Sequence, residues 1–201
     1  MSLARGGHYP AFSYHARVAG LEDEALRGVT RWTRIALLAG LAIWTWQFAR
    51  TPISPDAMDS WLHLPNLIFH EAGHFIFAMF GQFMTALGGS LLQFLIPVIA
   101  AIAFLRQEPP EVFGAAICTW WAGQNLVDLA PYIADSRSLQ LVLLGGKTGA
   151  EVEGHDWEFI LTQLGILHLD HAIGRSTHAI GIAIMIGAMA FAVRTVLKKS
   201  G

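Results

Sequence analysis

Two histidines and a glutamate are the residues of this chain whose types and spacing most clearly indicate chemistry. His70, Glu71 and His74 form an H-E-x-x-H pattern. Residues four apart lie on one face of an α-helix, so both imidazoles can bind the same metal ion. Glu71 lies about 100° further around the helix, where it would act as a base rather than a ligand. It could take a proton from a water molecule that the metal activates and deliver it to a leaving amine.

The segment that carries this motif, residues 61–80, is apolar enough to be a membrane helix. Ionisable groups at membrane depth are costly and persist mainly where function needs them. His63 and Asn66 extend the two histidines into a polar stripe, at steps of three and four residues. The pattern therefore predicts a metal site within the bilayer, holding one zinc ion per chain. The alternative is a pair of histidines that only bond neighbouring helices.

A zinc site needs a third protein ligand and an open position for water. Asp128 is the first candidate, on a predicted helix at 112–133 that also carries Asn125. If the connections are regular, this helix runs parallel to the motif helix and Asp128 reaches a depth similar to His74. His155 and Asp156 are the alternatives, because a re-entrant connector could bring them to the site. Further candidates are Asp135, His168, Asp170, His171 and His178.

Small and polar residues also share a face of the predicted helix at 83–105. Gly89 and Gln93 lie on it, and the glycine permits close approach of another backbone. Such a face could admit an extended substrate strand, although close helix packing explains it equally well. With Asn66 and Asn125, these residues are our candidates for a path that substrate or water would follow.

Composition places the whole chain among membrane proteins. Of its 201 residues 54% are hydrophobic and only 14% charged, whereas about 25% charged is usual in soluble domains. We expect an all-α polytopic bundle of about five transmembrane helices, at 33–48, 61–80, 83–105, 112–133 and 172–196. A segment at 157–167 is shorter than the ~20 residues a crossing needs, and we interpret it as an interfacial or re-entrant helix. Residues 1–28 are expected to form a polar, loosely ordered arm with a short helix near 21–28, and residues 29–201 the membrane domain.

Charge gives the expected orientation and excludes one class of partner. The net charge of −2 gives no reason to expect nucleic acid. Arg31 and Arg34 stand with further arginines before the first predicted span, which places the N-terminus in the cytoplasm by the positive-inside rule. Five crossings would put Lys198 and Lys199 on the opposite side, against the same rule. A sixth crossing by 157–167 would remove the conflict, and both counts stay open.

With H-E-x-x-H on a membrane helix, a glycine-bearing helix after it and then Asn125-Leu-Val-Asp128, the chain resembles the site-2 protease family of intramembrane zinc metalloproteases. The resemblance covers about residues 61–135. It implies that His70, His74 and Asp128 bind zinc, that Glu71 is the catalytic base, and that the substrate is a membrane protein or peptide cut in or near a transmembrane segment. It also suggests a bacterial inner membrane. Leu129 stands where the family has a glycine after the aspartate, which marks a divergent member.

A second class of function is non-enzymatic. The chain contains nine histidines, many more than one protease site requires. A histidine-rich membrane protein that binds or transports a divalent metal would also explain them, as would an inactive structural homologue. The role of Glu71 separates these hypotheses, because a base is needed only for hydrolysis.

Overall fold

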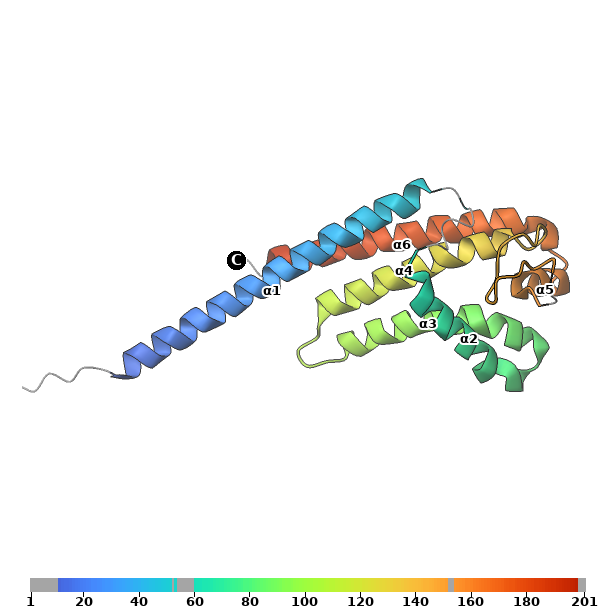
Figure 1. The fold of residues 1–201 in the computed structure, drawn as a ribbon. Helices are drawn as coiled ribbons and strands as arrows, with labels where there is room; N and C mark the ends of the chain where they lie inside the picture. The colour runs from blue at the N-terminus through green and yellow to red at the C-terminus, as the bar shows by residue number, and fades with distance from the viewer. Residues whose placement is uncertain (1–10, 52, 54–59, 152–153, 199–201) are drawn as a thin grey trace, which may run out of the picture.

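The computed structural model describes residues 11–51, 53, 60–151 and 154–198, and within them every regular element is helical. Figure 1 shows the arrangement. The α-helices are α1 (Ala11–Arg50), α2 (His63–Phe77), α3 (Gln82–Leu105), α4 (Val112–Ala134), α5 (Asp156–Gln163) and α6 (Asp170–Lys198), with single 3₁₀ turns η2 (Ala78–Phe80) and η3 (Leu167–Leu169). The prediction of an all-α fold is confirmed for this part of the chain.

Each predicted helical segment coincides largely with an observed helix, although residues 61–62 precede α2 and residues 164–166 follow α5. The N-terminal helix is longer than expected. α1 begins at Ala11, so residues 11–28 continue the helix instead of forming a loose arm with a short helix. The segment 21–27 is rich in leucine, glutamate, alanine and arginine, which are strong helix formers. Gly20 costs only about 1 kcal/mol in a helix, so it does not end α1. The first ten residues of the predicted arm lie outside the described residues.

Two of the described helices are long and apolar enough to cross a membrane. They are α3, at Gln82–Leu105, and the segment Leu167–Leu197, which comprises η3 and nearly all of α6. Each exceeds the ~20 residues that span a hydrocarbon core. The prediction of about five crossings stays a prediction.

Helix α4 is central to the bundle and packs closely on α6. A methyl group added to Gly123 would lie 2.7 Å from the carbonyl oxygen of Gly181, and one added to Gly181 would lie 2.6 Å from that of Gly123. The two backbones therefore touch, as small residues allow at helix crossings. Val127 and Met185 fill the adjoining core and are almost completely buried.

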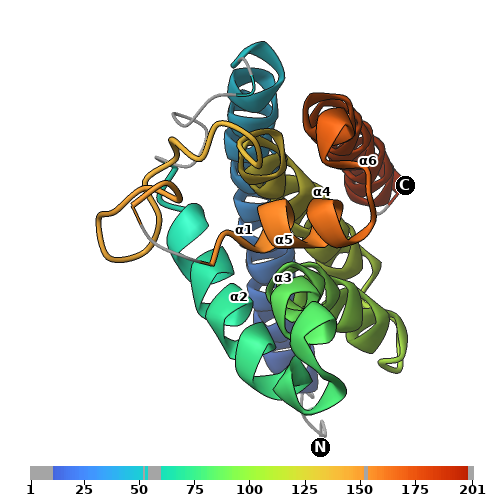
Figure 2. The same ribbon diagram turned by 90° about the vertical axis from the view of Figure 1, so that its right-hand side faces the viewer.

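Helices α2 and α3 form a second close pair, joined at Gly81. The φ angle of Gly81 is +93°, a conformation that glycine adopts without strain. A methyl group on Gly73 would come within 2.1 Å of the Gly88 carbonyl oxygen, so these backbones also touch. The short helix α5 lies against α3 and α4, and Figure 2 shows it beside α2 and α3 at one end of the bundle. This arrangement brings the H-E-x-x-H helix next to the first residue of α5.

Candidate metal centre

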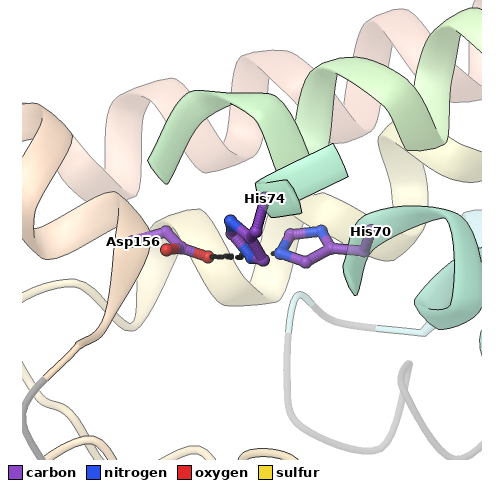
Figure 3. Close-up of side chains that lie close together, drawn as sticks. All are labelled: His70, His74 and Asp156. Atoms are coloured by element: carbon purple, nitrogen blue, oxygen red, sulfur yellow. Dashed lines mark hydrogen bonds and ion pairs between the residues drawn. The ribbon is translucent and has the colours of Figure 1, made fainter. Parts of the chain in front are cut away.

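Three side chains from two helices converge at one point. His70 and His74 project from α2, and Asp156 is the first residue of α5 (Figure 3). The Nε2 atoms of His70 and His74 lie 3.2 and 3.3 Å from the same carboxylate oxygen, Asp156 Oδ2. All three atoms lie within 4.8 Å of one another and could hold a metal ion. Two imidazole nitrogens and one carboxylate oxygen are a known ligand set of catalytic zinc.

Hydrogen bonds on the far side of each ring determine which nitrogen faces this point. His74 Nδ1 donates to the backbone oxygen of Thr85 at 2.8 Å. His70 Nδ1 donates to Gln93 Oε1 at 3.0 Å, and Gln93 Nε2 donates to Asp128 Oδ2 at 3.1 Å. Because an ionised carboxylate only accepts hydrogen bonds, Asp128 orients the Gln93 amide so that its oxygen faces His70. Each ring therefore carries a proton on Nδ1, and in its neutral form it presents a lone pair at Nε2.

Asp156 faces Nε2 of both rings. Burial alone would raise the pKa of the Asp156 carboxyl, but its interactions with His70 and His74 outweigh burial and hold this pKa below its ordinary value. Asp156 is thus anionic, and a proton or a cation between the three atoms satisfies it. Without either, three electron-pair donors would face one another, which is repulsive.

Tyr132 and His155 hold Asp156 in place. The Tyr132 hydroxyl donates to Asp156 Oδ2 at 3.2 Å and accepts from the Asp156 backbone N–H at 3.0 Å. His155 is the N-cap of α5: its Nδ1 accepts from the Glu158 N–H at 3.1 Å. Burial lowers the pKa of His155, which keeps the ring neutral and able to accept. His155, an alternative ligand in the sequence analysis, is therefore a neighbour that positions the ligand.

Asp128 is not brought to His74, in contrast to the first-choice prediction. Its carboxylate accepts from His63 Nδ1 at 3.0 Å and from Asn66 Nδ2 at 3.2 Å, besides Gln93. Its two partners on α2, His63 and Asn66, belong to the first turn of that helix, whereas His74 lies about two turns further along. The structure places the alternative candidate, Asp156, at the two histidines instead.

A cavity of about 420 Å³ adjoins the three ligands. Glu71 lines it, as the role of a base requires, together with Gln93 and Tyr132. An apolar wall is supplied by Leu67 on α2, Leu129 on α4 and the connector residues Val142, Leu143 and Leu144. The motif thus faces a space large enough for several residues of a substrate.

The other candidates for a substrate or water path have different surroundings. Asn66 is fully buried and bonds Gln124 and Trp121, and Asn125 bonds the Trp121 carbonyl. Neither lines the cavity. A methyl group on Gly89 would lie 2.6 Å from His70 Nε2 and 2.8 Å from His74 Cε1. Gly89 therefore makes room for the two imidazoles rather than for a substrate strand.

Two contributors had no predicted role. Tyr132 lies one helical turn after Asp128 on the same polar face of α4, and that spacing was the signal that could have identified it. Thr85 contributes a backbone oxygen, which leaves no trace in the residue type.

Comparison with known proteins adds no assignment to this geometry. The chain matches no protein-family model, no curated protein and no solved structure.

Proposed function

We propose that this protein is a zinc-dependent endopeptidase embedded in a membrane, which hydrolyses peptide bonds in or near transmembrane segments. The observation that carries the proposal is the convergence of His70 Nε2, His74 Nε2 and Asp156 Oδ2 beside a cavity that Glu71 also lines. When both rings are neutral, the three atoms are electron-pair donors directed at one point, and a cation would be held between them. Imidazole nitrogens favour zinc over magnesium or calcium, which prefer sites made of oxygen ligands alone.

The site residues divide the work of hydrolysis. Zinc, when bound, supplies Lewis acidity that activates water and polarises a carbonyl. Glu71 accepts a proton from the attacking water as the new C–O bond forms. It returns this proton to the amide nitrogen as the C–N bond breaks, so that an acid and an amine are released. Tyr132 keeps Asp156 in place throughout, and Gln93 keeps His70 in the tautomer that leaves Nε2 free.

Two features support a membrane location. Two helices have the length and composition of membrane spans. Large apolar side chains on α2 and on the adjoining turn η2 are open to the surroundings: Phe75 is 85% exposed, Met79 82% and Ile68 68%. Lipid would cover such a face, which water would not favour. We propose that the N-terminus lies in the cytoplasm, because arginines precede the first predicted span. The proposed location in a bacterial inner membrane follows from the resemblance to site-2 proteases.

The first test is the metal content of the purified protein and its dependence on the motif. We expect one zinc per chain in the wild type, none in His70→Ala, and a full complement in Glu71→Gln. A metal-free wild type would contradict the proposal.

The second test separates hydrolysis from mere metal binding. Cleavage of membrane-segment peptides should fall at least a hundredfold in Glu71→Gln, because removing a general base costs about 10²–10⁴ in rate. If the protein only binds or carries the metal, wild type and Glu71→Gln should bind or transport it equally well.

A further inference from the structure

A second cavity borders the metal centre from another side. It has a volume of about 540 Å³, and its walls include Gln82 and Thr85 at the start of α3 and Glu158 on α5. Gly154 and Asp156 line both this cavity and the one that contains Glu71. The aspartate ligand therefore stands between two spaces.

This placement suits a polypeptide that passes across the metal centre. An extended chain rises about 3.3 Å per residue, so a few residues on each side of a scissile bond would occupy the two cavities. An enzyme that removes a terminal residue needs room for a chain on one side only. The presence of a cavity on either side of Asp156 therefore fits an enzyme that cuts within a polypeptide segment.

Both cavities combine polar and apolar walls. Around Glu71 an apolar wall from Leu67 to Leu144 stands beside the carboxylates of Glu71 and Asp128. The second cavity has the apolar Ala86 and Phe159 with Gln82 and Thr85, and its charged side chain besides Asp156 is Glu158. Asp156 would be neutralised by the metal it binds, whereas Glu158 would not.

Glu158 has no partner of opposite charge among the described residues. Its Oε1 accepts a hydrogen bond from Thr162 Oγ1 at 3.3 Å, and no described lysine or arginine forms a salt bridge with it. Its side chain is half-buried at the wall of the cavity. A negative charge in this position favours a cationic occupant.

We propose that Glu158 binds a lysine or arginine side chain of the substrate, on one side of the scissile bond, while apolar substrate residues occupy the cavity around Glu71. This proposal rests on the proposed endopeptidase function. Lysine and arginine gather beside membrane spans at their cytoplasmic ends, so an apolar segment with a basic flank is a common chemistry among membrane polypeptides. The apolar part of such a segment would contact the apolar wall near Glu71, and its basic flank would contact Glu158.

Helix stability offers another explanation for Glu158. An acidic residue in the first turn of a helix interacts favourably with the helix dipole. That role affects the stability of α5 but gives no preference among substrates. A test must therefore measure selectivity as well as stability.

The probe is a set of synthetic peptides in detergent micelles, each with one apolar segment flanked on either side by lysine, glutamine or glutamate. We expect zinc-loaded wild type to cleave one lysine-flanked peptide about fivefold faster than its glutamine counterpart, as a single half-exposed ion pair would give. Glu158→Gln should remove the preference, so that the lysine-flanked and glutamine-flanked peptides are cleaved at equal rates. Glu158→Lys should reverse it toward glutamate. Glu108→Gln, an exposed glutamate on the α3–α4 connection, is the matched control.

Binding to the Glu71→Gln background separates this inference from the proposed function. The lysine-flanked peptide should bind Glu71→Gln about fivefold more tightly than it binds Glu71→Gln with Glu158→Gln. Charge-dependent binding without any cleavage by wild type would overturn the peptidase function but support the cation-binding site at Glu158. If wild type and Glu158→Gln cleave the peptides with the same order of rates, only the cation-binding site is overturned. A lower Tm with unchanged selectivity would assign Glu158 to helix stability.

Discussion

At the scale of single residues, the centre depends on polar side chains that do not touch the metal position. Asp128 orients Gln93, Gln93 orients His70, and only then does the Nε2 lone pair of His70 face Asp156. The partners behind metal ligands fix ring orientation and tautomer, and their loss weakens metal affinity about 10–100-fold. Asp128 is thus part of the site although it lies outside the ligand group.

The two aspartates should respond differently to the same substitution. In Asp156→Asn an anionic ligand is lost, so we expect the purified protein to contain no zinc. In Asp128→Asn the ligands remain but Gln93 is less firmly oriented, so zinc should stay bound with affinity lower by about 10–100-fold. Competition with a chelator measures both. Retention of zinc by Asp156→Asn with its loss from Asp128→Asn would show that Asp128 is the true ligand.

The sequence was sufficient to predict part of this site. The histidine pair and its glutamate followed from spacing alone, because a helix puts residues four apart on one face. The choice between Asp128 and Asp156 could not be made in this way. It depends on how steeply α2 crosses α4 and on where the connector between α4 and α5 returns, and neither is encoded in local periodicity.

At the scale of elements, glycines set the distances on which the site depends. Gly73 lets α2 approach α3 so closely that their backbones touch, and Gly89 leaves space for both imidazoles. A larger side chain at Gly73 would meet the backbone of α3, and one at Gly89 would meet the rings of His70 and His74. Helix packing and metal geometry are therefore coupled through α3.

Alanine substitution of two helical glycines should have opposite effects on stability. Gly73→Ala places a methyl group 2.1 Å from the Gly88 oxygen, so we expect a loss of about 1–3 kcal/mol or more. Gly40→Ala in α1 meets nothing within 4 Å and should stabilise by roughly 0.5–1 kcal/mol, since alanine favours helix. Thermal unfolding in detergent compares the two. If both substitutions changed the unfolding temperature in the same way, α2 and α3 would have to lie further apart than described.

The positions of the helices were well predicted, because long apolar runs bounded by polar or proline-containing connectors leave few alternatives. The start of α1 was not. Residues 11–28 were judged by their polarity, and that prediction overlooked their helix propensity and the helical spacing of Val18, Leu21 and Ala25.

At the scale of the whole molecule, the proposed membrane location can be tested by measuring on which side of the membrane each end of the chain lies. Five crossings would put the ends of the chain on opposite sides, with the N-terminus in the cytoplasm. A tag at each end, probed by protease in intact cells and after permeabilisation, should therefore be protected at one end only in intact cells. Two ends on the same side would instead favour an even number of crossings, and a chain released by alkaline washing would contradict membrane integration.

Asp156 follows His74 by about 80 residues and arrives on a separate short helix. During synthesis at ~5–20 residues per second, the ribosome needs on the order of ten seconds to pass from one to the other. Under the proposed function, a nascent chain would hold an incomplete ligand set while its first helices are already emerging, and it would bind the ion only after Asp156 has been synthesised. Such timing would keep an immature hydrolase from attacking its neighbours during biogenesis.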